Sequence, residues 1–396
     1  MDFQKLKDLD VANKTVLLRA DLNVPRQGNL VTDHARIDRL LPTIEYLREQ
    51  GAIVLILSHF GRPEGEQQPE MSLAFLAPIL EKQWNCPVKF SPVCIGETAQ
   101  NIANSAKSGD IILMENLRFH KGEKANDIDF AKELAKLGNI YVNDAFSASH
   151  RAHASTVGLP KLMPHAAGLL MEEELAALTK ALETPKKPVL AVVGGAKIST
   201  KLSVLENLIE KVDYLVLGGG MANTFLYAGG VDVKQSLCEK DMVKTATLIM
   251  EKAKSIGCEI ILPKDLIVVA ELKENAAHKC VDIDNIPEGY MAIDIGEKTI
   301  AYISEKITIS KTIVWNGPMG VFEIKPFDNG TNKIAQIVAN QTISDKCISI
   351  AGGGDTVSAL ENADVAADFS YISTAGGAFL EWLEGKDLAG VLALRK

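Results

Sequence analysis

Short apolar runs alternate with amphipathic stretches along the whole chain. Segments such as residues 35–51 and 130–139 repeat their apolar residues at helical spacing. Continuous Val, Ile and Leu runs separated by such helices are typical of parallel strands buried on both faces. The pattern therefore predicts an α/β fold. The runs that we expect to form strands cover residues 15–21, 52–59, 110–116, 139–144, 189–195, 214–220, 259–263, 312–317 and 347–355.

The pattern also divides the chain into two halves of comparable size. Residues 171–183 predict a helix, and the two prolines of the TPKKP segment that follows end it before the next strand. A chain of 396 residues exceeds what one hydrophobic core usually supports. We therefore expect two domains joined by a helix.

Composition excludes several classes of protein. The net charge of −9 argues against a binder of nucleic acid or of an acidic membrane, because either partner would require a basic surface. The first residues contain no apolar signal segment, and no apolar run reaches the length of a membrane span. The six cysteines are scattered, as is typical of reduced thiols. We expect a soluble cytoplasmic protein.

The ends of the predicted strands differ between the two halves. In the first half they carry polar and charged side chains, in RADLNVP, SHFGRP, ENLRFH and NDAFSASHRAH. In the second half they carry glycine, in VVGGAK, VLGGGMANTF, WNGPMG and IAGGGDTVSA. Ligands of open parallel sheets bind beyond these strand ends. Arg and His recognise small, multiply charged anions, whereas glycine loops at helix N-termini admit a polyphosphate. The two halves thus predict the two substrates of a small-molecule kinase.

Two lysines follow the first glycine pair of the second half. Lys197 and Lys201 come after Gly194 and Gly195, and their spacing places them on one helix face if the strand runs directly into a helix. The segment differs from the G-x-x-x-x-G-K-[ST] loop of nucleoside triphosphatases. The glycine loops also lack the G-x-G-x-x-G pattern, which disfavours a dehydrogenase.

Ordinary structural roles compete with these interpretations. A glycine pair is more often a tight turn than a phosphate site, and a lone arginine is usually a solvated surface charge. His59 and His150 can act as structural hydrogen-bonding residues, and we prefer that interpretation for His120 and His165. The alternatives are a two-lobed protein that binds an anion without catalysis and a catalytically inactive scaffold, and the presence of Lys197, Lys201 and Asp355 argues against both.

Taken together, the motifs resemble those of the phosphoglycerate kinase family. In chain order they are RADLNVP, SHFGRP, ENLRFHKGE, NDAFSASHRAH, GGAKISTKL, GGGMANTFL, VWNGPMGVFE and AGGGDTVSAL. The resemblance extends from about residue 15 to the C-terminal tail. One position departs from it, because the family commonly reads S-T-G-G-G-A and Ala375 replaces the first glycine. If that position requires a positive φ, alanine strains the turn.

The resemblance implies two Rossmann-like lobes. Residues 1–170 would bind 3-phosphoglycerate, with a tail at 380–396 packing back on them. Residues 171–187 would form the interdomain helix and linker, and residues 188–379 would bind ATP or ADP with Mg²⁺. The implied reaction is glycolytic. A monomer would transfer a phosphoryl group directly and reversibly between 1,3-bisphosphoglycerate and ADP, with closure of the lobes.

The resemblance also assigns roles by position. Phosphoglycerate binding falls to Asp21, Asn23, Arg36, His59, Arg62, Arg118 and Arg151. Nucleotide binding falls to Gly194, Gly195, Lys197, Lys201, Gly218, Gly219, Asn316, Pro318, Glu323, Gly353, Gly354, Asp355 and Thr356. Asp355 would bind the metal, and the catalytic residues would be Arg36, Lys197 and Lys201. The accepting carboxylate is already ionised, so catalysis requires positioning and charge neutralisation rather than a general base. We expect Arg36 and Lys197 to clamp the transferring group.

Overall fold

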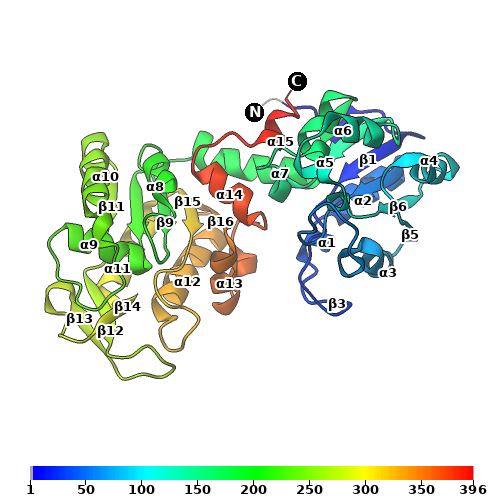
Figure 1. Ribbon diagram of the computed structural model, residues 1–396. Helices are drawn as coiled ribbons and strands as arrows, with labels where there is room; N and C mark the ends of the chain where they lie inside the picture. The colour runs from blue at the N-terminus through cyan, green and yellow to red at the C-terminus, as the bar shows by residue number, and fades with distance from the viewer. Residues whose placement is uncertain (1–2, 396) are drawn as a thin grey trace. The chain divides into compact units, whose positions relative to one another are not determined.

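The chain folds into two compact units. Unit 1 comprises Met1–Ala176 and Asp387–Lys396, and unit 2 comprises Ala177–Lys386. The computed structural model describes residues 3–395, and Figure 1 shows them coloured along the chain. Helix α7 (Leu169–Leu178) carries the chain from unit 1 into unit 2. None of the helices within the described residues is long and apolar enough to cross a membrane.

Unit 1 is built on a six-stranded parallel sheet with the order β5-β6-β4-β1-β7-β8. The side chains of strands β1, β4, β6 and β7 are almost all buried and most are Val, Ile or Leu, so both faces of the sheet are covered. The strands are β1 Thr15–Arg19, β4 Ile53–Leu57, β5 Val88–Ser91, β6 Ile111–Met114, β7 Ile140–Asn143 and β8 His165–Ala167.

Short helices and one hairpin complete unit 1. Asp127 begins α6, because its carboxylate accepts hydrogen bonds from the backbone N–H groups of Asp129 and Phe130. The C-terminal α15 is tied to this unit by a hydrogen bond from Gly390 N to Ser149 O of 2.8 Å. The elements are β2 Arg26–Gln27, β3 Leu30–Val31, α1 Ala35–Asp38, α2 Leu41–Glu49, α3 Ala77–Trp84, α4 Gly96–Ser105, α5 Lys121–Lys124, α6 Ile128–Ala135 and α15 Ala389–Leu392.

Unit 2 contains a second six-stranded parallel sheet, with the order β11-β10-β9-β15-β16-β17. From β9 the chain first builds the sheet on one side and then returns to build it on the other. The strand order therefore reverses between β9 and β15, and such reversals are where open α/β sheets bind ligands. The strands are β9 Val189–Val193, β10 Tyr214–Leu217, β11 Glu259–Ile261, β15 Thr312–Asn316, β16 Ile348–Gly352 and β17 Tyr371–Ser373.

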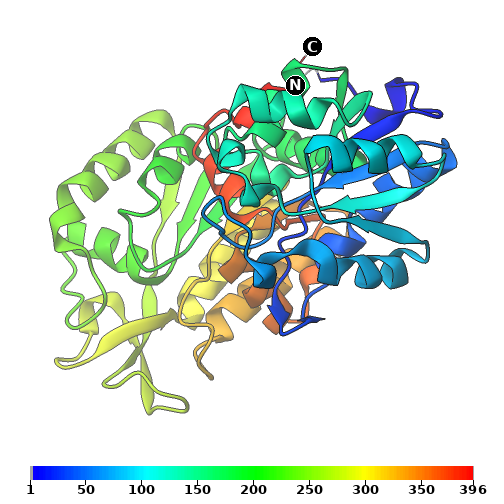
Figure 2. The same cartoon turned by 45° about the vertical axis from the view of Figure 1, so that its right-hand side comes forward.

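A small antiparallel sheet, ordered β13-β12-β14, is inserted between β11 and β15. Figure 2 shows these strands in yellow at one end of unit 2. They are β12 Asp265–Val269, β13 His278–Asp282 and β14 Met291–Ile295. The helices of unit 2 are α8 Leu202–Leu208, α9 Gly219–Ala228, α10 Val243–Ile256, α11 Glu297–Ile309, α12 Asn329–Ile343, α13 Gly354–Asn362 and α14 Gly376–Leu383.

The prediction of an α/β fold with two parallel sheets is confirmed. All nine predicted runs contain a strand. Strands β5, β8 and β17 were not predicted, because they lack a continuous apolar run. The three strands of the small antiparallel sheet, β12, β13 and β14, were not predicted either. The predicted helix at 171–183 is observed as α7 followed by a π-helical turn at Thr179–Glu183.

The C-terminal segment differs from the expected arrangement in two respects. Helix α14 belongs to unit 2, since Asn207 Nδ2 donates to Leu383 O at 2.7 Å, and the tail in unit 1 begins at Asp387 rather than at residue 380. Ala375 precedes α14 with a φ of −100°. This position does not require glycine, so the alanine causes no strain there.

Candidate functional site

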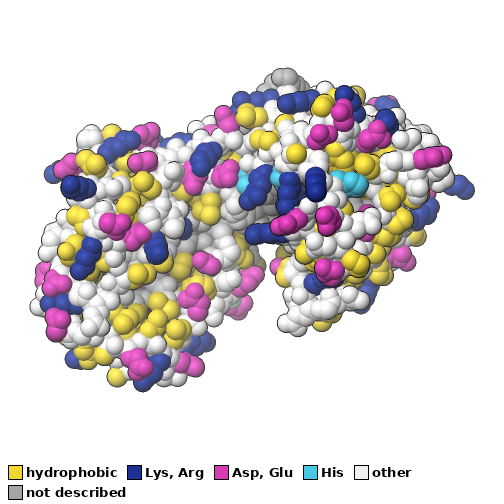
Figure 3. Space-filling view, in the orientation of Figure 1, with side chains coloured by type: hydrophobic (Ala, Val, Ile, Leu, Met, Phe, Trp, Pro, Cys, Tyr) yellow, Lys and Arg dark blue, Asp and Glu magenta, His cyan; other side chains and the backbone are white. Residues whose placement is uncertain are grey.

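The carboxyl ends of four neighbouring strands of unit 1 gather the expected anion-binding side chains. The order β6-β4-β1-β7 brings together the loops that follow these strands. Asp21 and Asn23 follow β1, His59 follows β4, and Arg118 follows β6. Figure 3 shows Lys, Arg and His side chains gathered on one part of the surface of this unit. The residues Asp21, Asn23, Arg36, His59 and Arg118 are called the basic cluster below.

Arg36 is held at this edge by the β1 loop. Its Nη1 lies 3.0 Å from Asp21 Oδ2 and donates to Asn23 O at 2.7 Å. Ser147, from the loop after β7, donates a hydrogen bond to the same Asp21 oxygen. Burial alone would raise the pKa of Asp21, but the charge of Arg36 and these hydrogen bonds lower the pKa to about 2. Asp21 is therefore an anion that orients Arg36 at neutral pH.

Two polar side chains fix the turn that follows β4. Asn23 Oδ1 accepts a hydrogen bond from Gly61 N at 2.9 Å, and Arg118 Nη1 donates to Gly61 O at 2.7 Å. The buried Asn116 supports the same turn through its Nδ2, which donates to Phe60 O at 2.7 Å. These contacts connect the loops after three strands into one rigid edge.

Arg118 keeps unused donor capacity. Its Nε is buried and has no hydrogen-bond partner within residues 3–395. Burial, together with the charge of Arg19, lowers the pKa of Arg118 to about 10, so the guanidinium remains charged at neutral pH. A buried donor without a partner is costly, and an anion would satisfy it.

The two outer arginines are less constrained. Arg62 and Arg151 are exposed, and Arg151 Nε donates to His150 Nε2 at 3.1 Å. The His120 ring stacks on Phe130, with the ring centroids 5.0 Å apart. The structure therefore links Asp21, Asn23, Arg36 and Arg118 through hydrogen bonds and an ion pair, and it places His59 just after the end of the neighbouring strand β4. Arg62 and Arg151 lie at the surface.

In unit 2, Lys201 lies at the point where the strand order reverses. Its Nζ donates to Gly194 O at 2.7 Å, to Asn316 O at 3.2 Å and to Asn316 Oδ1 at 2.6 Å. Gly194 follows β9, and Asn316 ends β15. Burial lowers the pKa of Lys201 to about 8, although the charge of Asp355 acts in the opposite direction. The ammonium is thus held beside both glycine turns.

The close approach of these turns requires glycine at residue 194. A Cβ at this position would lie 1.7 Å from Pro318 O. On the other side of β9, Gly219 N donates to Met319 O at 2.8 Å, and Gly218 N donates to Val193 O at 3.1 Å. The loops after β9, β10 and β15 are therefore in backbone contact with one another.

The loop after β16 is fixed to the same edge. Gly353, with φ +100°, and Gly354 open α13, and Thr356 Oγ1 accepts a hydrogen bond from Gly317 N at 2.7 Å. Asn316 Nδ2 donates to Gly352 O at 2.7 Å. The N-terminus of α13, which favours anions, thus lies next to Lys201.

The expected helical placement of Lys197 is wrong. Helix α8 begins only at Leu202, and residues 196–201 form turns. The carboxylate of Glu239 holds this segment, accepting hydrogen bonds from Ser199 N at 3.0 Å and Ser199 Oγ at 2.6 Å. Gly195, with φ +145°, redirects the backbone before it. Lys197 is exposed, whereas Lys201 turns inward, so the two lysines do not share a helix face.

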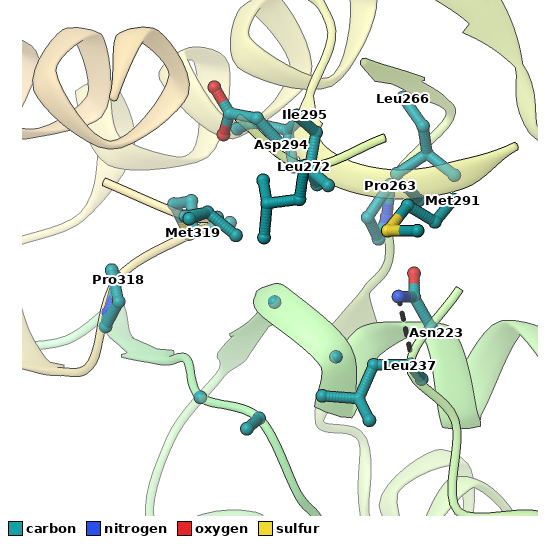
Figure 4. A pocket seen from close by; sticks show the side chains of 18 of the residues that line it. Asn223, Leu237, Pro263, Leu266, Leu272, Met291, Asp294, Ile295, Pro318 and Met319 are labelled. Atoms are coloured by element: carbon teal, nitrogen blue, oxygen red, sulfur yellow. Dashed lines mark hydrogen bonds between the residues drawn. The ribbon is translucent and has the colours of Figure 1, made fainter. Parts of the chain in front are cut away.

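A cavity of about 310 Å³ lies beside these loops. Gly195, Gly219, Pro318, Glu323 and Asp355 contribute to its walls. In Figure 4, apolar side chains face one another across it, and Asn223 Nδ2 donates to Leu237 O at 3.2 Å. The apolar walls are formed by Leu237, Pro263, Leu266, Leu272, Met291, Ile295 and Met319.

The cavity has the character of a site for a flat, partly apolar ligand. Leu237 and Leu272 are 52% and 40% exposed, so a ligand that covered them would remove apolar surface from water. None of these apolar residues was predicted from the sequence, because they come from several elements far apart in the chain and meet only in the folded structure. Ser199, Asn116 and Ser147 lie within the quoted motifs, but they and Glu239 were missed because their hydrogen-bond partners lie far away in the chain.

The donor set at Asp355 fits one kind of metal site. The described residues contain no group of three or more His, Cys, Asp or Glu side chains arranged to hold a metal ion. Asp355 is exposed in the first turn of α13 and borders the cavity. Mg²⁺ is commonly bound by one or two carboxylates together with phosphates of a substrate. A single carboxylate beside an anion-binding helix N-terminus fits that arrangement.

Comparisons with known proteins all lead to one family. The family model described as phosphoglycerate kinase matches residues 6–386. A phosphoglycerate kinase of Rhodospirillum centenum is 56% identical over 394 residues, which cover 100% of both chains. A phosphoglycerate kinase of Methylorubrum extorquens is 54% identical, covering 100% of this chain and 99% of the relative. The solved structure of phosphoglycerate kinase from Coxiella burnetii has a TM-score of 0.93 at 44% sequence identity, and the match covers 99% of this chain and 98% of that chain.

Proposed function

The chain belongs to the phosphoglycerate kinase family, and we propose that unit 1 binds the phosphoglycerate and unit 2 the adenine nucleotide. The chain is a glycolytic kinase: it transfers a phosphoryl group reversibly between 1,3-bisphosphoglycerate and ADP. The observation that carries the division between the units is the contrast in chemistry at their strand ends. Unit 1 offers charged side chains, and unit 2 offers a lysine among glycine turns beside an apolar cavity.

The basic cluster suits a small ligand with a phosphate and a carboxylate. Arg36 and Arg118 supply guanidinium groups, and Asn23 and His59 supply neutral polar groups between them. Arg62 and Arg151 are exposed at the surface and would add further positive charge. Asp21 acts by orienting Arg36 and does not itself repel the ligand, because its charge is compensated by that arginine.

The cavity of unit 2 suits an adenine nucleotide. Sites for small molecules usually measure about 300–1,000 Å³ and are lined mainly by apolar side chains. The base would lie between the apolar walls, with Glu323 at the edge for the ribose. The phosphates would meet Lys201 and the glycine turns that open α9 and α13. Asp355 would hold Mg²⁺, which offsets negative charge on the nucleotide phosphates.

The chemistry that remains for the protein is positioning. In the direction that consumes ATP, the acceptor is a carboxylate, which is ionised at neutral pH and requires no general base. Arg36 would neutralise charge on the transferring group from the phosphoglycerate side, and Lys197 from the nucleotide side. Direct transfer requires the two substrates to come within bonding distance, so closure of the lobes is part of the proposal.

Composition and domain organisation indicate the compartment, the partners and the assembly of the chain. The six cysteines form no disulfides, which supports work in a reducing compartment such as the cytoplasm. The net charge of −9 supports the absence of a nucleic-acid partner. We propose a monomer, because each unit supplies a complete set of ligands for one substrate.

Steady-state kinetics tests the proposal. ADP formation from MgATP is measured with and without 3-phosphoglycerate, and a downstream reductase consumes the acyl phosphate. Turnover should require 3-phosphoglycerate, and Arg36→Ala should lower kcat by roughly 10²–10³-fold. An Arg36→Ala enzyme with unchanged kcat would exclude a role for Arg36 in the transfer step.

A further inference from the structure

Arg19 is a fully buried arginine that makes no direct ion pair with a carboxylate among residues 3–395. It ends β1 and has no exposed surface. Its Nε donates to Ser155 Oγ at 2.9 Å, and its Nη1 donates to the backbone carbonyl of Ala20. A buried guanidinium is costly unless its donors are satisfied. The position therefore needs an explanation beyond packing.

A relay through a hydroxyl fixes the plane of this guanidinium. Ser155 Oγ donates to Glu123 Oε1 at 2.6 Å, and Ser155 N donates to Glu123 Oε2 at 3.0 Å. Glu123 is fully buried and supplies the compensating negative charge. Because Ser155 gives its proton to Glu123, its oxygen accepts the hydrogen bond from Arg19 Nε. The relay leaves Nη2 of Arg19 pointing toward the basic cluster.

That Nη2 lies 2.9 Å from Nδ1 of His59. Arginine has only donors and stays protonated in proteins, so Nδ1 of His59 must be the acceptor. An imidazole that accepts at Nδ1 is neutral and carries its proton on Nε2. The parallel pairing of β1 with β4 creates this contact, since Arg19 lies opposite Leu57, two residues before His59.

We propose that Arg19 is a positioning residue that holds His59 in the neutral tautomer with its proton on Nε2. His59 then presents a fixed N–H donor to the anionic substrate instead of a titrating charge. The part of this inference that concerns the substrate rests on the proposed phosphoglycerate site. The part that concerns the tautomer stands without it.

The charges that face His59 support a neutral ring. Arg19, Arg118 and His153 disfavour protonation, and Asp21 favours it. Burial is the largest influence and, together with Arg19, places the pKa of His59 well below its usual value. Protonation would also set Nδ1–H against the Arg19 N–H, and neither group can accept.

Nuclear magnetic resonance of ¹⁵N-histidine-labelled full-length protein, without substrate, tests the tautomer directly. The His59 signals are assigned by their loss in His59→Gln. Between pH 6 and 8, His59 should show a protonated Nε2 and an unprotonated Nδ1. A ring protonated on Nδ1, or on both nitrogens, in the wild-type protein would overturn the proposal.

Arg19→Lys tests the positioning role, with Arg48→Lys as the matched control elsewhere in unit 1. Arg19→Lys should release His59 into a mixture of tautomers and raise KM for 3-phosphoglycerate about tenfold, as expected for the loss of one well-oriented hydrogen bond to a charged ligand. KM for ATP should stay constant. A pure Nε2–H tautomer in Arg19→Lys would exclude the role of Arg19. A mixture of His59 tautomers in Arg19→Lys without any change in KM for 3-phosphoglycerate would support the role of Arg19 and count against the proposed substrate site.

Discussion

Gly194→Ala is the substitution whose effect follows most directly from the structure. A Cβ at residue 194 would lie 1.7 Å from Pro318 O and 2.8 Å from Gly317 C, both backbone atoms. Carbon and oxygen need about 3 Å, so the two loops must separate by roughly another ångström. Overpacking of this kind costs about 1–3 kcal/mol of stability.

The same displacement should damage catalysis on the nucleotide side only. The loops that would separate carry both carbonyl acceptors of Lys201, on Gly194 and Asn316. A displacement of about 1 Å from the productive position typically costs about 10²-fold in rate. We therefore expect kcat/KM for MgATP to fall about 10²-fold, while KM for 3-phosphoglycerate stays constant because no atom of unit 1 is involved.

The assay is steady-state kinetics with each substrate varied in turn, together with urea unfolding of both proteins. Gly376→Ala is the matched control, because a Cβ at this residue of unit 2 meets nothing within 4 Å. It opens α14, where alanine is a good helix former, so stability and kinetics should be retained. Wild-type kinetics for MgATP in Gly194→Ala would refute the argument from close approach.

Three further predictions concern single side chains. Because burial lowers the pKa of Lys201 to about 8, the ammonium is lost as pH rises through 8. The profile of kcat/KM for MgATP against pH should therefore fall above about pH 8 in the wild type and stay flat to higher pH in Lys201→Arg; the same fall in the variant would contradict the assignment. Arg36 and hydrogen bonds lower the pKa of Asp21 to about 2, despite the opposing effect of burial. This shift stabilises the folded protein by about 2 kcal/mol above the unfolded pKa of about 4, and the stabilisation is lost as pH falls toward 2. The free energy of urea unfolding should therefore change less between pH 7 and pH 3 in Asp21→Asn than in the wild type. Glu239→Gln should weaken the hydrogen bonds that hold Ser199 and so make the turn that carries Lys197 more mobile. We expect kcat to fall about 3–10-fold, with little change in the Kd of ADP measured by calorimetry. An unchanged kcat would show that the turn does not depend on the Glu239 carboxylate.

The sequence predicted the parts of the fold that follow from continuous apolar runs. Each of the nine runs is long enough to be buried on both faces, and each contains a strand of the two sheets. The contrast between charged and glycine-rich strand ends was also readable, because the carboxyl ends of parallel strands meet at one edge. Strand β8 was not readable, because its three residues, His165–Ala167, include no Val, Ile or Leu.

The rest depended on contacts between residues far apart in the chain. The spacing of Lys197 and Lys201 suggested one helix face, but Glu239, about forty residues later, holds Ser199 in a turn and delays the helix. The apolar cavity is assembled from side chains on several elements, none of which is distinctive alone. The contact between Arg19 and His59 exists only because β1 and β4 pair in parallel.

The division of the two substrates between the two units is tested most directly by calorimetric titration of two matched variants. Arg118→Ala and Lys201→Ala are each titrated separately with 3-phosphoglycerate and with MgADP. Arg118→Ala should lose affinity for 3-phosphoglycerate and keep that for MgADP, whereas Lys201→Ala should do the reverse. Loss of MgADP affinity in Arg118→Ala, or of 3-phosphoglycerate affinity in Lys201→Ala, would contradict the account.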